Sequence, residues 1–123
     1  DRLRSRGLGD VYKRQLIDSA KDYVHRNYRS VDLGLDDTCK ELGVSNSYFS
    51  SLFKKETGSS FVEYLTDYRM DKAARMLVET DDKSYVIAQN VGYADPNYFS
   101  YVFKRKYGVS PSRYRTEYEK NKV

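Results

Sequence analysis

The sequence predicts an all-α protein of seven helices, forming two helix-turn-helix subdomains joined by a long linker helix. Three observations support this fold class. The 123 residues include only two prolines and seven glycines, a composition that favours helices. Apolar residues recur at helical spacing along most of the chain. A helix-turn-helix pattern also occurs twice, with its two copies 50 residues apart.

The internal repeat covers both proposed subdomains. At an offset of 50, the matching residues are Tyr48-Phe49-Ser50 with Tyr98-Phe99-Ser100, Phe53-Lys54-Lys55 with Phe103-Lys104-Arg105, Gly58 with Gly108, Ser60 with Ser110, and Tyr64 with Tyr114. Upstream, Leu42-Gly43 matches Val91-Gly92 at an offset of 49, so the second copy has one extra turn residue. Two copies are too few for a solenoid and indicate a duplicated module.

Apolar spacing and capping residues place the helices in order. Helices are expected near 16–28, 35–42, 46–57, 61–79 and 84–91, then from Pro96, and near 111–120. Their apolar stripes are Leu16, Ala20 and Val24; Leu35, Cys39 and Leu42; Phe49, Leu52 and Phe53; Phe61, Leu65, Tyr68, Ala73, Met76 and Leu77; Ile87, Ala88 and Val91; and Phe99, Val102 and Phe103. The expected caps are Gly43, Ser45, Ser60 with Glu63, Gly92, Asp95 before Pro96, and Ser110 before Pro111. We therefore expect subdomains at 16–59 and 81–123, with a linker helix at 60–80.

The first fifteen residues are set apart by their charge. The net charge of the chain is +4, but residues 1–15 carry five basic and two acidic side chains, so the other 108 residues carry only +1. This stretch shows no clean helical period and resembles sequence fused in front of a domain; a native basic linker is the alternative. Bulk charge therefore decides little about nucleic-acid binding, and the distribution of charge matters more.

The helices at 46–57 and from Pro96 each separate an aromatic side from a polar side when wound at 100° per residue. The outward residues are Ser47, Ser50, Ser51 and Lys54 on the first helix, and Asn97, Ser100, Tyr101 and Lys104 on the second. Small polar groups allow a helix to approach base edges in the major groove. One such face is usually only a solvated surface, but two matching faces after short helices and glycine turns favour DNA reading.

Cations near the ends of these helices complete the expected interface. We expect phosphate contacts from Lys54, Lys55, Lys104, Arg105, Lys106 and Arg113. The 19 residues of the expected linker helix would measure roughly 28 Å. That length is close to the ~34 Å between successive major grooves on one side of B-DNA.

At these residues the chain resembles a known family. From about residue 16 to 120 it is similar to the DNA-binding domain of AraC/XylS transcription regulators, through LGVS, YFSSLFKKETGSSFVEYLTDYRMDKAARML and IAQNVGYADPNYFSYVFKRKYGVSPSRYR. The resemblance implies a cytoplasmic bacterial regulator with two recognition helices in adjacent major grooves. It implies base or near-base contacts from Ser47, Ser50, Ser51, Asn97, Ser100 and Tyr101. It also implies RNA polymerase as a partner and an N-terminal sensor or receiver domain outside this chain. Family members often carry a basic residue where Ser51 and Tyr101 stand, so the usual arginine–guanine contact is absent at those positions.

The sequence offers little for other functions. His25 is the only histidine and Cys39 the only cysteine, so we expect no catalytic triad, metal site, cofactor or disulfide, and no enzyme. Cys39 is expected to be a buried thiol, and the lone cysteine fits a reducing compartment. No apolar run approaches a membrane span. The competing hypothesis is a helical protein–protein interaction module, and tyrosine stacking on single-stranded bases is a further alternative.

Overall fold

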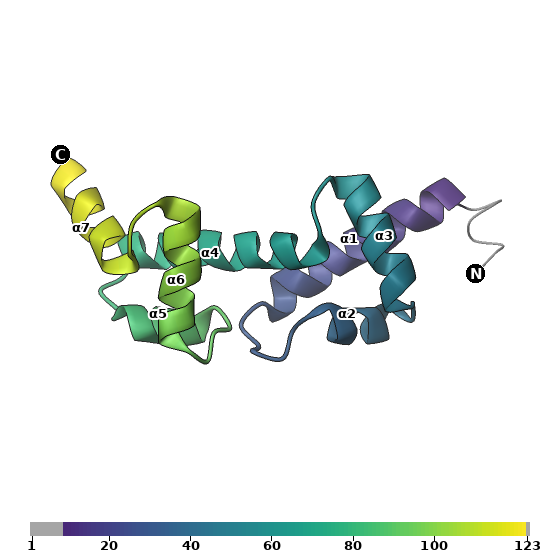
Figure 1. The fold of residues 1–123 in the computed structure, drawn as a ribbon, viewed down its shortest axis with the longest axis horizontal. Coiled ribbons are helices and arrows are strands. Elements are labelled where there is room, and N and C mark those ends of the chain that lie inside the picture. Colours follow the sequence, from purple (N-terminus) through teal and green to yellow (C-terminus); the bar gives the residue numbers. More distant parts are fainter. Residues whose placement is uncertain (1–8, 123) are drawn as a thin grey trace. The chain divides into compact units, whose positions relative to one another are not determined.

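The computed structural model describes residues 9–122, and within that span every regular element is an α-helix (Figure 1). The helices are α1 (Gly9–Asn27), α2 (Leu35–Leu42), α3 (Asn46–Thr57), α4 (Phe61–Glu79), α5 (Ser84–Asn90), α6 (Pro96–Tyr107) and α7 (Pro111–Asn121). The all-α prediction with seven helices is thereby confirmed for the described residues.

Most predicted helix boundaries agree with the structure, and the exception is the first helix. The bounds of α2, α3 and α4 match the expectation, and α5 and α7 each differ from it by one residue. Helix α1 already includes Gly9, so residues 9–15 are helical rather than part of a tail; residues 1–8 lie outside the described residues. The spacing of apolar residues did not predict this part of the helix, because it lacks a buried apolar stripe and Val11 is 64% exposed. Asp10 in the first turn favours the start of a helix there.

Most predicted caps are in place, but the C-cap of α5 is Val91 rather than the expected Gly92. Ser45 accepts a hydrogen bond from the Tyr48 amide, Asp95 from the Asn97 amide and Ser110 from the Arg113 amide. Ser60 and Glu63 form the reciprocal capping box at the start of α4, with bonds of 2.8 and 3.0 Å. The two longer helices of the repeat, α3 and α6, both end at a glycine in the left-handed conformation, Gly58 with φ 84° and Gly108 with φ 82°. The repeat in the sequence therefore gives two helices that begin and end at equivalent residues.

The contacts divide the chain into two compact units. The first contains the chain up to Asn27 together with Leu33–Leu65, and the second contains Tyr28–Asp32 together with the chain from Thr66 onward. Helix α4 contributes to both units, whereas the sequence expectation treated 60–80 as a separate linker. Each unit has its own core.

In the first unit, α1 packs against both α2 and α3. The core is built on two fully buried phenylalanines of α3, Phe49 and Phe53, whose rings both meet Phe61 at the start of α4, at 5.5 and 5.6 Å between centroids. The other buried apolar residues of this unit are Leu16, Ile17, Ala20, Val24, Leu33, Cys39, Leu52 and Leu65. Edge-on ring contacts of this kind stabilise the packing beyond the area they bury.

The second unit repeats this design around α6. Phe99 and Phe103 are fully buried, and Phe103 meets Tyr114 of α7 edge-on at 5.4 Å, as Phe53 meets Tyr64 in the first copy. The remaining core residues are Tyr28, Met70, Ala73, Ala74, Leu77, Ile87, Ala88 and Val91. The inward aromatic residues predicted from the helical spacing are therefore core residues in both copies.

A buried arginine joins three segments of the second unit. Arg69 of α4 is 7% exposed; its Nε donates to the Tyr28 carbonyl at 3.0 Å and its Nη2 to the Ser30 carbonyl at 2.7 Å. The same guanidinium lies 5.5 Å from the Tyr93 ring centroid. Gly92 lies against this cluster with φ 96°, and a Cβ atom there would be 2.5 Å from the Tyr28 oxygen and 2.8 Å from the Arg69 guanidinium. Only glycine fits this turn without a shift of the arginine.

We expect Gly92→Ala to lower the free energy of unfolding of the second unit by about 3 kcal/mol, through left-handed backbone strain together with the clashes with the Tyr28 carbonyl and Arg69. Gly108→Ala is the matched control, since Gly108 has φ 82° but no atom within 4 Å of the place that a Cβ would occupy. It should cost only the backbone strain, about 1–2 kcal/mol. Urea denaturation followed by circular dichroism measures both, and equal losses would contradict the role given to the Arg69 contact.

Candidate nucleic-acid interface

The outer face of α3 carries the predicted serines. Ser47 and Ser51 are exposed and Ser50 is half-buried, so none of the three is part of the core. Asn46 at the start of α3 donates to the Asp36 carboxylate of α2, which fixes the two helices of the first helix-turn-helix to each other. A shallow depression of about 370 Å³ lies beside this face, lined by Lys13, Ser47, Tyr48, Ser51, Leu52 and Lys55.

The outer face of α6 has the same register but larger side chains. Asn97 is exposed, Ser100 is half-buried and Tyr101 is 57% exposed. Asp95 caps this helix and Pro96 occupies its first turn, so Asn97 lies at the well-ordered N-terminal end. The structure therefore brings each predicted base-contacting trio onto one helix surface, and whether these residues contact bases stays a prediction.

Three of the predicted phosphate-binding cations are open to solvent. Lys54, Lys55 and Lys104 are exposed, and within residues 9–122 none of them forms an ion pair. All three lie in the last turn of α3 or α6, where the negative end of the helix dipole favours a cation. They are therefore available to neutralise an external anion.

Lys106 is engaged within the second unit. Its Nζ lies 2.8 Å from Oδ1 of Asp71 and 3.5 Å from Oδ1 of Asp67, both on α4. The Tyr107 hydroxyl donates to the same Asp71 oxygen at 2.8 Å. Partial burial opposes ionisation of Asp71, but the hydrogen bonds from Lys106 and Tyr107 outweigh it and lower the pKa of this carboxyl. Lys106 thus holds α6 to α4 and would have to leave two carboxylates to reach a phosphate.

Two arginines of α7 have different surroundings. Arg113 is exposed and pairs with Glu117 one turn later at 3.1 Å, a contact that is weak in water. Arg115 instead donates to the carbonyls of Leu77 and Thr80, at 2.8 and 3.0 Å, and so caps the C-terminal end of α4. The basic residues of the second unit therefore divide into a structural group and a group exposed on the surface.

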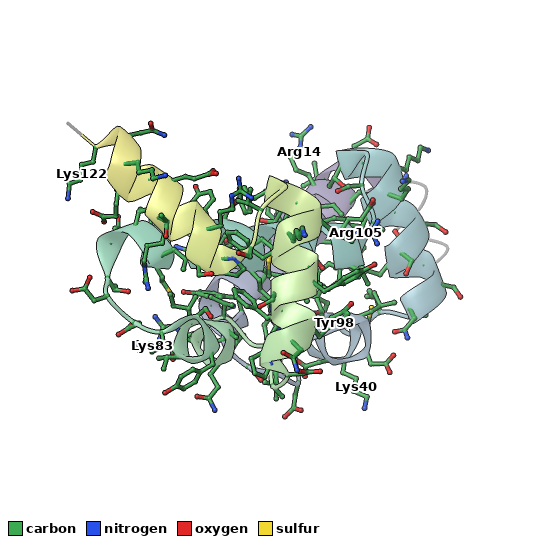
Figure 2. All side chains as sticks on the ribbon, turned by 60° about the vertical axis from the view of Figure 1, so that its left-hand side comes forward. Arg14, Lys40, Lys83, Tyr98, Arg105 and Lys122 are labelled. Atoms are coloured by element: carbon green, nitrogen blue, oxygen red, sulfur yellow. The ribbon has the colours of Figure 1, made fainter. Side chains whose placement is uncertain are left out.

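Tyr98 lies on the outer surface of α6. Its side chain is 55% exposed, whereas its repeat partner Tyr48 is half-buried. Its ring lies beside that of Tyr101 one turn later, with centroids 6.3 Å apart and planes at 27°. Figure 2 labels Tyr98 and, two turns further along α6, Arg105. The spacing of three between Tyr98 and Tyr101 was the signal in the sequence that could have revealed this pair.

The other candidates from the sequence have ordinary surroundings. Cys39 is 2% exposed, and burial together with the nearby Asp36 raises the pKa of its thiol. His25 is exposed, with Nε2 2.7 Å from the Tyr64 hydroxyl. In the part of the chain that the structure describes, no three metal-binding side chains are grouped to hold an ion, and none of the helices has the length and apolarity required to cross a bilayer.

Comparison with known proteins identifies the family. A model of the helix-turn-helix domain, of the AraC type, matches residues 38–117, which is more than half of the chain. The chain belongs to this family. It is thus an AraC-type DNA-binding helix-turn-helix domain, as the resemblance of its motifs implied.

Individual relatives agree with the family. The chain is 36% identical to the lactose operon transcription activator of Staphylococcus xylosus over 80 residues, which are 65% of this chain and 28% of that protein. It therefore spans only about a quarter of that relative's length. The C-terminal domain of the response regulator AraT from Geobacillus stearothermophilus is 39% identical, with a TM-score of 0.81 over 83% of this chain and 84% of that one.

A third neighbour supports the fold alone. The DNA-binding domain of the transcription factor AdpA, solved in complex with a target DNA, has a TM-score of 0.81 at 22% identity and covers 86% of this chain and 95% of its own. At that identity the arrangement of helices is shared, and no residue role is transferred.

We expect Asp71→Asn to destabilise the second unit at neutral pH by about 0.5 kcal/mol, because Asp71 is largely exposed and solvent screens its ion pair. The sign follows from the lowered pKa. The contribution of Asp71 is complete above the unfolded-state value of about 3.9 and disappears as the pH falls through the lower folded-state value. Urea denaturation at pH 7 and pH 2 should therefore show a smaller difference from the parent protein at pH 2 than at pH 7. Asp82→Asn, in the exposed loop before α5, is the control.

Proposed function

We propose that this domain binds double-stranded DNA sequence-specifically, with α3 and α6 as recognition helices in two successive major grooves. One observation carries the proposal: two helices of 12 residues, at equivalent positions of a repeat, each expose polar side chains ahead of cations in the last turn. That arrangement suits a helix entering the major groove, where hydroxyl and amide groups reach base edges and lysines neutralise flanking phosphates.

The linker supports binding to two grooves. Helix α4 is continuous over 19 residues, so it spans roughly 28 Å, near the ~34 Å that separates major grooves on one side of the duplex. We propose that one protein molecule contacts two half-sites separated by about one helical turn of DNA.

The family also gives the domain its place in a larger regulator. We propose that the domain positions a transcription regulator at promoters, with RNA polymerase as the further partner. Support comes from the activator named among its relatives and from the neighbour that is a C-terminal domain of a response regulator. We propose that the control signal acts on a part of the regulator outside this domain.

Selection of bound duplexes from a random library tests the proposed function. We expect the purified domain to enrich a motif with two parts about 10 base pairs apart, one for each recognition helix. Recovery of unenriched sequences, or of a motif with a single part, would contradict specific binding by two helices.

We expect Lys54→Ala and Lys104→Ala to weaken binding to every DNA sequence to a similar degree. Each change should also lower the slope of log affinity against log salt concentration by about one, because each removes one phosphate contact. Lys106→Ala is the comparison, since Lys106 is paired with Asp71 and should alter the slope less. Fluorescence anisotropy across a series of salt concentrations provides the slopes. A change in base preference in the lysine variants, with an unchanged slope, would instead indicate base contacts.

We expect Asn97→Ala to relax preference at one base pair, by about 1–3 kcal/mol if its amide makes two hydrogen bonds to an adenine. The exposed position of Asn97 in the first turn of α6 is the reason for the choice. Repeating the selection with the variant measures the effect. An unchanged motif would remove Asn97 from the set of base-contacting residues.

A further inference from the structure

A series of neighbouring arginine and tyrosine side chains, here called the ladder, runs through the second unit to the surface of α6. It begins at the buried Arg69, whose guanidinium lies 5.5 Å from the Tyr93 ring centroid. Tyr93 lies 6.0 Å from Tyr98, and Tyr98 lies 6.3 Å from Tyr101. The ladder ends at Arg105, whose guanidinium carbon is 5.8 Å from the Tyr101 ring centroid and whose Nη1 donates to the Tyr101 hydroxyl at 3.4 Å.

The inner end of the ladder is fixed and the outer end is open. Arg69 is 7% exposed and is held by two backbone carbonyls, whereas Tyr98 and Tyr101 are each more than half exposed. Stacking on Tyr101 restricts the rotamers of Arg105 before any ligand arrives, so less conformational entropy is lost on binding. The guanidinium of Arg105 is therefore oriented before a ligand binds and does not move freely.

The first copy of the repeat has no such ladder. The residues equivalent to Tyr98, Tyr101 and Arg105 are Tyr48, Ser51 and Lys55. Without a second ring at Ser51, Tyr48 lies against the protein, and among the described residues its buried hydroxyl has no hydrogen-bond partner. The two helices thus present different chemistry: a serine surface on α3, and a surface of two tyrosines and an arginine on α6.

The surroundings of Arg105 disfavour a phosphate on its inner side. Arg105, Tyr98 and Tyr101 line a depression of about 330 Å³ together with Asp67 of α4 and Lys106. The charge of Lys106 is offset by its contacts with Asp67 and Asp71. The carboxylate of Asp67, already 3.5 Å from Lys106, would repel a phosphate entering there. A base edge carries no net charge, so the penalty there is smaller. In the major groove, guanine offers two acceptors to a guanidinium and thymine offers a methyl group to an apolar ring.

We propose that Tyr101 and Arg105 together form a specificity element of α6 that reads a thymine adjacent to a guanine. The Tyr101 ring packs against the C5-methyl group of the thymine, and Arg105 donates two hydrogen bonds to O6 and N7 of the guanine. The ring of Tyr98 packs beside the ring of Tyr101 and supports it. This rests on the proposed function, and it changes the role of Arg105 from the phosphate contact expected from the sequence to a base contact.

Base analogues test the proposal without altering the protein. The probe is the duplex enriched by selection with the parent domain, in which single thymines are replaced by uracil and single guanines by 7-deazaguanine. Uracil lacks only the methyl group, and 7-deazaguanine lacks only the N7 acceptor. We expect one thymine in the α6 half-site at which uracil weakens binding about fourfold, and an adjacent guanine at which 7-deazaguanine weakens it about tenfold.

Three variants assign those effects to residues. Arg105→Lys keeps the charge and loses the fork, so it should abolish the effect of 7-deazaguanine while the effect of uracil remains. Tyr101→Ser reproduces the arrangement on α3 and should abolish the effect of uracil. Tyr118→Ser, which removes a 43% exposed tyrosine of α7, is the control and should change neither. Circular dichroism spectra of the variants confirm that each is folded.

Each outcome supports or overturns the element. Equal affinity and base preference in the Arg105→Lys variant would make Arg105 a phosphate contact and overturn the proposal. Insensitivity of an enriched duplex to uracil at every thymine of the α6 half-site would overturn it as well, while specific DNA binding would stand. Failure to enrich any duplex would overturn the proposed function and this specificity element together.

Discussion

The second unit depends on one buried cation being satisfied. A guanidinium removed from water is costly unless its donors find acceptors, and Arg69 meets this requirement with the carbonyls of Tyr28 and Ser30 and the face of Tyr93. Burial lowers the pKa of Arg69, but an arginine starts so high that the charge persists. The segment after α1, the middle of α4 and the turn before α6 are therefore held at one point. The turn can come that close only because residue 92 has no side chain beyond hydrogen.

The two copies of the repeat show how one scaffold supports two surfaces. Both recognition helices share their length, their glycine ends and their buried phenylalanine pairs, so the backbone frame is nearly the same. The difference lies in a few outward positions. A serine at residue 51 leaves room for close approach, whereas a tyrosine at residue 101 adds area and orients the cation after it. Folding and recognition are thus carried by separate faces of the same helix.

The sequence predicts the helices of this fold well because its signals are local. Capping residues such as Ser45, Asp95 and Ser110 act within three residues, and glycine ends act at one residue, so the limits of α2, α3 and α4 follow directly. The start of α1 was missed because its first turns bury little apolar area, and helix detection by periodicity needs a buried stripe.

Partners across the fold could not be predicted in the same way. Lys106 and Arg105 are neighbours in a basic run, yet one binds two carboxylates of α4 and the other stacks on Tyr101. Arg69, about forty residues from its carbonyl acceptors, appears in the sequence as one more charge on a helix. Contacts of this range depend on how helices pack, and a pattern of single residues carries no distance information about them. Family membership supplied the role of the domain, and the structure supplied the distribution of its charges.

The bonds from Arg115 to the carbonyls of Leu77 and Thr80 couple two helix ends that are far apart in the chain. Fraying of the last turn of α4 breaks these bonds, and so does detachment of α7, so the two motions form a single local opening event. Loss of α7 will consequently destabilise the C-terminal end of α4, in the middle of the chain.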